Sequence, residues 1–191
     1  MAKLHFKYSC MGGGKTLDLI RTAYNYEERG LSPLLLTSAI DNRYGQGKIT
    51  TRVGLQREAL IIDKTMNVYE FIKNYQYDNK IDVILIDEAM FLSKEHILQL
   101  TDIVDTLNIP VVCYGLRSTY TLDTFDGSTY LLSLADEITE IKAICHCGRK
   151  ATINTMYDGD KIVKQGEKIV IGGNGKYTSL CRKCWKEGNL K

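Results

Sequence analysis

The stretch that decides the fold is Lys3–Thr16, KLHFKYSCMGGGKT. Alternating apolar residues over Leu4–Tyr8 predict a short strand, and the glycines Gly12–Gly14 predict a turn. Lys15–Thr16 then begins an amphipathic helix that we expect to continue to about residue 29. A strand, a glycine loop, a lysine with a hydroxyl residue and a helix, in this order, are typical of a nucleotide-phosphate site.

Backbone N–H groups explain why this pattern binds phosphate. Glycines allow successive N–H groups to curve around an anion, and the helix N-terminus adds unpaired donors. Lys15 is predicted to reach the β- and γ-phosphates, and Thr16 to ligate Mg²⁺. Ser9 stands where the usual spacing of this motif has glycine. The alternative to a phosphate site is a glycine-rich turn before an ordinary helix. The residues predicted to hold the nucleotide are Ser9, Cys10, Met11, Gly12, Gly13, Gly14, Lys15, Thr16 and Asp87.

Composition limits the class of protein. A chain of 191 residues that is 44% hydrophobic suits one domain with a small appendage. Its net charge of +2 indicates neither a nucleic-acid partner nor a membrane partner, and no apolar run suggests a signal peptide or a membrane span. Four of the six cysteines form two close pairs, which favours a reduced, cytoplasmic protein with a metal site.

Continuous apolar runs at Pro33–Thr37, Ile81–Ile86 and Val111–Tyr114 are typical of parallel strands buried on both faces. Helical spacing over Asn67–Tyr77, and a helix capped by Ser93, alternate with them. The sequence therefore predicts an α/β fold, a doubly wound parallel sheet whose ligands bind at the carboxyl ends of its strands.

Polar residues follow these strands. The segment 41–54 is predicted to be a polar loop, with Asp41 and Arg43 either contacting substrate or phosphate, or simply exposed. Asp87, at the end of a buried strand, is predicted to hold Mg²⁺, and Glu88 to accept the proton of the attacking nucleophile. The pair alone does not distinguish an ATPase, with a water nucleophile, from a kinase, with a substrate hydroxyl.

The chain changes character at about residue 141, which divides it into a P-loop domain (1–140) and a small zinc-binding β domain (141–191). Cys145, Cys147, Cys181 and Cys184 supply four thiolates, a set that suits a closed, structural Zn²⁺ site. His146 is an alternative ligand, although its position between two cysteines makes joint ligation strained. An Asp-Gly turn at residues 158–159 predicts a β-hairpin.

These motifs together resemble the type II thymidine kinases over essentially the whole chain. The resemblance rests on blocks in the same order and spacing, namely YSCMGGGKT (8–16), IDNRYGQGKI (40–49), LIDEAMF (85–91), YGLRSTY (114–120), ICHCGRKA (144–151), VIGGNGKY (170–177) and SLCRKCW (179–185).

The resemblance implies transfer of the γ-phosphate of ATP to the 5′-hydroxyl of thymidine, a step of nucleotide salvage for DNA synthesis, with Glu88 as the base. It implies a lasso loop over residues 168–177 that closes on the thymine ring. It also implies a homotetramer, inhibition by thymidine triphosphate, and deoxyuridine as a further candidate substrate. The residues that it places at the substrate are Met11, Arg43, Phe91, Leu116, Thr119, Phe125, Ile169, Val170, Ile171, Gly172 and Tyr177.

Three residues depart from the family pattern. Met90 replaces a usual glutamine, Tyr120 a usual phenylalanine, and Thr119 an aspartate of close bacterial relatives, so they bear on substrate preference. Two other functions are compatible with these motifs. A zinc-ribbon ATPase acting on nucleic acid would hydrolyse ATP without thymidine, and a non-enzymatic adaptor would bind nucleotide without phosphoryl transfer.

Overall fold

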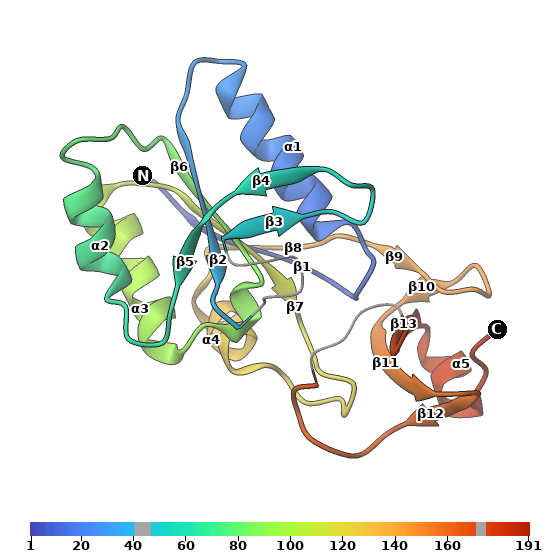
Figure 1. The fold of residues 1–191 in the computed structure, drawn as a ribbon. Helices are drawn as coiled ribbons and strands as arrows, with labels where there is room; N and C mark the ends of the chain where they lie inside the picture. Colours follow the sequence, from blue (N-terminus) through green and yellow to red (C-terminus); the bar gives the residue numbers. More distant parts are fainter. Residues whose placement is uncertain (41–46, 171–174) are drawn as a thin grey trace.

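The protein is built on a twisted parallel β-sheet, seen in a computed structural model that describes residues 1–40, 47–170 and 175–191 (Figure 1). Every pairing between neighbouring strands of this sheet is parallel. Its strands lie in the order β5 (Leu60–Ile62), β2 (Pro33–Ser38), β6 (Val83–Asp87), β7 (Val111–Leu116), β1 (Leu4–Ser9) and β8 (Glu137–Glu140).

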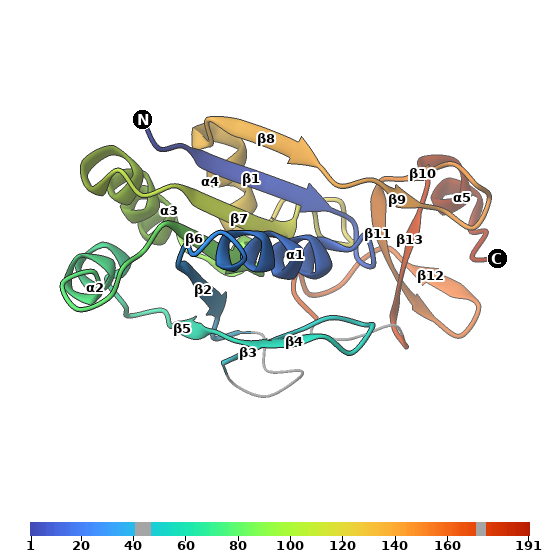
Figure 2. The ribbon, with the colours of Figure 1, turned by 90° about the horizontal axis from the view of Figure 1, so that it is seen from above.

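Helices cover both faces of the sheet, so the predicted α/β doubly wound fold is confirmed (Figure 2). Helix α1 (Lys15–Glu27) buries Leu19, Ile20 and Ala23 against one face. The opposite face carries α2 (Val68–Tyr75), α3 (Lys94–Asp102), the π-helical turn η2 (Ile103–Leu107) and α4 (Asp126–Leu134). Parallel strands need such two-sided cover because their apolar side chains project from both faces.

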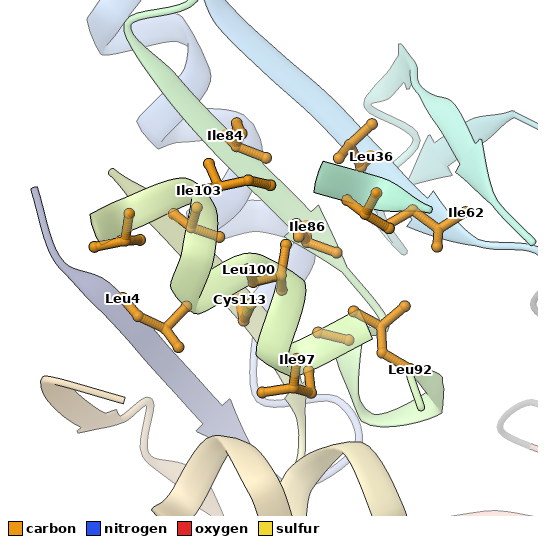
Figure 3. Close-up of a cluster of buried hydrophobic side chains, with 14 of the residues drawn as sticks. Leu4, Leu36, Ile62, Ile84, Ile86, Leu92, Ile97, Leu100, Ile103 and Cys113 are labelled. Carbon is orange, nitrogen blue, oxygen red and sulfur yellow. The ribbon is translucent and has the colours of Figure 1, made fainter. Parts of the chain in front are cut away.

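The larger core lies between the sheet and helices α2 to α4 (Figure 3). Ile84 and Ile86 of β6 meet Ile97 and Leu100 of α3, and all four are fully buried. Ser93 caps α3 as predicted, because its hydroxyl accepts the N–H of His96 while the His96 ring accepts the Ser93 N–H. The cap therefore sets where this helix starts on the core.

A smaller unit follows β8 and lies beyond the arrowheads of β1 and β8 (Figure 2). Its apolar core is made largely of cysteines and small residues. The predicted hairpin at residues 158–159 is confirmed by the antiparallel pairing of β11 with β12. The elements of this unit are β9 (Ala143–Ile144), β10 (Lys150–Ala151), β11 (Ile153–Asp158), β12 (Lys161–Val163), β13 (Tyr177–Leu180) and α5 (Arg182–Glu187).

The structure corrects part of the predicted element map. The segment predicted as a polar loop, residues 41–54, contains strand β3 (Lys48–Thr50). This strand pairs antiparallel with β4 (Gln56–Glu58), just after the segment, and its Ile49 is buried beside α1. The pattern was missed because each strand is three residues long. Helix α4 and edge strand β8 were also not predicted.

No helix among the described residues combines the length and the apolar character that a membrane crossing requires.

Gly127 lets α4 approach the backbone that follows β6. A Cβ atom at this position would lie 2.6 Å from the carbonyl oxygen of Ala89, 2.8 Å from that of Leu92 and 2.9 Å from that of Met90. We expect Gly127→Ala to destabilise the fold by about 3 kcal/mol or more, because backbone atoms cannot move aside as a flexible side chain can. The midpoint of denaturant unfolding measures this. Gly175→Ala is the control, since no atom of the described residues, its chain neighbours aside, lies within 4 Å of a Cβ added there. Equal stability of both variants would contradict the packing argument.

Candidate active site

The glycine loop between β1 and α1 forms a compact cradle. Gly12 and Gly14 have φ values of 77° and 84°, a left-handed conformation that favours glycine. The Gly13 N–H donates to the carbonyl oxygen of Cys10 over 3.2 Å, which closes the turn. Lys15 folds back and its ammonium donates to the same carbonyl oxygen, also at 3.2 Å. The loop therefore holds its lysine over the cradle.

Lys15 is a charged residue that is only 7% exposed. Burial lowers the pKa of its ammonium, whereas the carboxylates of Glu88 and Asp87 act in the opposite direction. A buried cation of this kind favours an anionic ligand, because phosphate oxygens would compensate the lost hydration.

Ser9 stands where the usual motif has glycine, and the absence of a side chain on Gly13 leaves room for it. Its side chain is 3% exposed, and its hydroxyl oxygen has no hydrogen-bond partner among the described residues. A Cβ on Gly13 would lie 1.8 Å from that oxygen. The serine therefore occupies the space that a side chain at residue 13 would need, so Ser9 and Gly13 are mutually dependent.

The two carboxylates after β6 have different surroundings. The Thr16 hydroxyl donates to Asp87 Oδ2 at 3.1 Å, and the Glu88 N–H donates to Asp87 Oδ1 at 3.0 Å. Glu88 itself adopts the left-handed region, with φ 53° and ψ 35°, which is uncommon for a residue with a side chain. Strain of this kind persists where surrounding contacts enforce it, and it clusters at functional sites. Thr16 and Asp87 together present hard oxygen donors of the type that Mg²⁺ prefers.

A cavity of about 320 Å³ joins these residues to an apolar wall. Met90, Leu116 and Phe125 form a buried cluster, with Met11 and Phe91 packed against it. The rings of Phe91 and Phe125 meet edge to face, with centroids 5.6 Å apart. The cavity has the size and the mixed lining of a small-molecule site.

A strap, defined here as residues 164–170, runs along this cavity and is tied down by side chains. The Tyr120 hydroxyl donates to the Glu167 carbonyl oxygen at 2.9 Å, and the Tyr177 hydroxyl donates to that of Val170 at 2.7 Å. Lys168 also forms an ion pair with Asp126 at 2.9 Å. The resemblance assigned no such role to Tyr120, yet its hydroxyl, which phenylalanine lacks, is one of these ties.

The C-terminal unit contacts the glycine loop directly through Asn154, which is 3% exposed. Its Oδ1 accepts the Met11 N–H at 2.8 Å, and its Nδ2 donates to the Ser118 carbonyl oxygen at 2.6 Å. The Ser179 hydroxyl donates to the Met11 carbonyl oxygen at 2.5 Å. Sequence reasoning missed Asn154, although an asparagine inside a predicted strand is unusual enough to be a signal.

The predicted cysteine cluster is present. The sulfur atoms of Cys145, Cys147, Cys181 and Cys184 all lie within 4.8 Å of one another. Cys181 caps α5, because its sulfur accepts the Cys184 N–H. This hydrogen bond holds the pKa of the Cys181 thiol below its usual range. The His146 ring instead contacts the Asn189 carbonyl oxygen at 3.2 Å. Four converging sulfurs fit a structural Zn²⁺, which would link both ends of this unit.

Most of the predicted site residues line this cavity. Ser9, Cys10 and Gly13 are not part of its lining but shape the loop behind it, and Asp41, Arg43, Ile171 and Gly172 lie outside the described residues. Arg52, Asn154 and Tyr120 also line it without having been assigned to the site. The predicted residues in the lining are Met11, Gly12, Gly14, Lys15, Thr16, Asp87, Glu88, Phe91, Leu116, Thr119, Phe125, Ile169, Val170 and Tyr177.

Comparison with known proteins gives matches over nearly the whole chain. The family model described as thymidine kinase matches residues 2–185. A thymidine kinase of Francisella tularensis subsp. holarctica is 50% identical, and the match covers 98% of each chain. The thymidine kinase of Mannheimia succiniciproducens is 48% identical over 98% of this chain and 96% of its own, and that of Shewanella oneidensis is 46% identical over 98% of each.

The contact between Ser9 and Gly13 makes a reciprocal prediction. Gly13→Ala should weaken nucleotide binding at least tenfold, because the added methyl group overlaps the Ser9 hydroxyl and would deform the cradle. Adding Ser9→Gly should recover much of the affinity, since it removes that hydroxyl. Titration calorimetry with ADP measures both variants. Equal losses in the single and double variants would show that the two positions are independent.

The cysteine cluster predicts one bound zinc per chain. Cys147→Ser should lose the metal and lower the thermal midpoint, because metal binding contributes about 10 kcal/mol or more to folding in small zinc units. His146→Ala is the matched control and should keep its zinc, since its ring lies outside the cluster. Elemental analysis and thermal unfolding report both properties. A metal-free parent protein would contradict the assignment.

Proposed function

The chain belongs to the thymidine kinase family, and from this premise we propose that it transfers the γ-phosphate of ATP to the 5′-hydroxyl of thymidine, with Glu88 as the general base. The observation that carries the proposal is a single cavity lined by the glycine loop, by Glu88 and by an apolar wall beside the strap. We place the donor triphosphate at the glycine loop and the nucleoside acceptor beside the apolar wall, with Glu88 in the same cavity.

The proposed reaction follows from the charges at the glycine loop. Lys15 and the loop N–H groups hold the β- and γ-phosphates, while Glu88 accepts the proton of the attacking hydroxyl. The Glu88 N–H is bonded to Asp87, which restrains the residue that carries the base. Thr16 and Asp87 would hold Mg²⁺, which supplies positive charge to the phosphates when it is bound.

The apolar wall and the strap suit a thymine ring. Phe91, Leu116 and Phe125 offer flat or aliphatic surface, and the strap offers backbone groups near Ile169 and Val170 for the polar edge of the base. The proposed contacts of Arg43, Ile171 and Gly172 remain predictions. Deoxyuridine lacks one methyl group, so we expect it to be accepted with about 10- to 200-fold lower efficiency.

Regulation and assembly complete the proposal. Thymidine triphosphate carries both a thymine ring and a triphosphate, so one molecule could occupy both parts of the cavity, which supports its role as a feedback inhibitor.

A homotetramer follows from the family resemblance. Six cysteines without a disulfide support a reducing cytoplasmic location. The division at residue 141 into a kinase domain and a zinc-binding domain is likewise proposed.

Glu88→Gln tests the base. We expect the turnover number with thymidine to fall by about 10²–10⁴, because an amide cannot accept the proton, while the unfolding midpoint stays within a few degrees. Glu70→Gln is the control, since this carboxylate lies exposed on α2 and pairs with Lys73. Turnover close to that of the parent in Glu88→Gln would assign the base elsewhere.

An ADP-release assay across a nucleoside panel tests the substrate, with and without single-stranded DNA. We expect ADP release that depends on thymidine and is unaffected by DNA. DNA-stimulated hydrolysis without nucleoside would indicate the zinc-ribbon ATPase, and tight nucleotide binding without any release would indicate an adaptor.

A further inference from the structure

Arg52 lies against the glycine loop although it belongs to a different element. It follows β3 in the turn of the β3–β4 hairpin, and it lines the cavity together with Gly12 and Lys15. A Cβ on Gly12 would lie 2.9 Å from Arg52 Nη1 and 3.5 Å from its central guanidinium carbon. The guanidinium therefore occupies the space that a side chain on Gly12 would fill.

The hairpin turn that carries Arg52 is tightly bonded. The Thr51 N–H donates to the Leu55 carbonyl oxygen at 2.8 Å, and the Leu55 N–H donates to the Thr51 hydroxyl at 2.9 Å. The Gly54 N–H closes the inner turn on the Thr51 carbonyl oxygen at 3.1 Å. These bonds restrain the backbone on both sides of Arg52, so its side chain projects from a defined position.

The hairpin is also anchored to α1. Ile49 of β3 is 2% exposed and packs in the core cluster that contains Leu19 and Ile20 of α1. At the far end, Arg57 of β4 forms an ion pair with Glu27, the last residue of α1. The views in Figures 1 and 2 both place the hairpin alongside this helix. The element that presents Arg52 is thus fixed to the helix that begins at Lys15.

Two cations meet at this loop. The charge of Arg52 opposes protonation of Lys15 and lowers its pKa, in addition to the larger effect of burial. Within the described part of the chain, no carboxylate forms an ion pair with Arg52. The carboxylates of Glu88 and Asp87 act on Lys15 in the opposite direction. Two cations held close together repel each other, and the negative charge of a phosphate group between them would attract both.

We propose that Arg52 is a further catalytic residue, an arginine supplied in cis by the β3–β4 hairpin that binds the γ-phosphoryl group of the nucleotide. This rests on the proposed function. A planar guanidinium offers two parallel donors to phosphate oxygens and keeps its charge throughout the reaction. Arg52 thereby neutralises negative charge on the phosphoryl group as it leaves ADP and bonds to the acceptor oxygen.

Steady-state kinetics of Arg52→Ala and Arg52→Lys test the proposal, with ATP and thymidine as substrates. We expect the turnover number to fall by about 10²–10³ in Arg52→Ala, the loss that follows removal of one preorganised donor to developing negative charge. Arg52→Lys should fall by about 10-fold or more, because an ammonium lacks the bidentate geometry. The KM for thymidine should stay within threefold, and the affinity for ADP should be unchanged, since ADP lacks the γ-phosphate.

Arg57→Lys is the matched control on the same hairpin. Its side chain pairs with Glu27 and does not line the cavity, so turnover should stay within threefold of the parent. Millimolar guanidinium ion, against NaCl at equal ionic strength, should partly restore turnover in Arg52→Ala.

Three results would overturn the role of Arg52. They are turnover within threefold of the parent in Arg52→Ala, a loss of ADP affinity matching the loss of turnover, or a change confined to the KM for thymidine. A parent protein that releases no ADP with thymidine would instead refute the proposed function, which separates the two failures.

Discussion

Hydrogen bonds to the backbone of Met11 join the two ends of the chain at the phosphate loop. Asn154 and Ser179 hold its N–H and its carbonyl oxygen, so the loop is shared between the parallel sheet and the cysteine-rich unit. Cys10 adds a sulfur contact to the Ala151 carbonyl oxygen at 3.6 Å. Glycines give a loop its anion-binding geometry but leave its backbone flexible. Here the hydrogen bonds from β11 and β13 restrain that backbone. The unit that contains the cysteine cluster therefore supports the proposed active site as well as its own small core.

Electrostatics and strain concentrate where β1, α1 and β6 meet. The ammonium of buried Lys15 donates to a backbone carbonyl oxygen, and two nearby carboxylates favour its charged form. Glu88 takes a left-handed conformation directly after β6. Gly127 allows α4 to press its backbone against the carbonyl groups of the turn that follows Glu88. This packing supplies surrounding contacts that can maintain an unfavourable backbone angle at Glu88, the proposed base.

The strap, which leads into the loop proposed to close on the base, is held in a defined geometry by side chains. Two tyrosine hydroxyls hold the carbonyl oxygens of Glu167 and Val170, while the rings of Tyr120 and Tyr177 meet at a centroid distance of 6.2 Å. Side chains from the region after β7 and from β13 therefore restrain the segment between β12 and the residues proposed to close on the base. Neutral hydroxyl-to-carbonyl bonds of this kind each contribute about 1 kcal/mol.

Local sequence determined the elements with strong periodicity and the motifs whose chemistry is complete within a few residues. The glycine loop, the β6 carboxylates, the Ser93 cap and the cysteine pairs are of this kind, because spacing alone sets their geometry. Tertiary structure alone decided the contacts between distant segments, such as Asn154 on Met11, Tyr120 on Glu167 and Arg52 on Gly12. The physical reason is that these contacts depend on how separate elements pack, and a three-residue strand such as β3 has too short a pattern to show its partner.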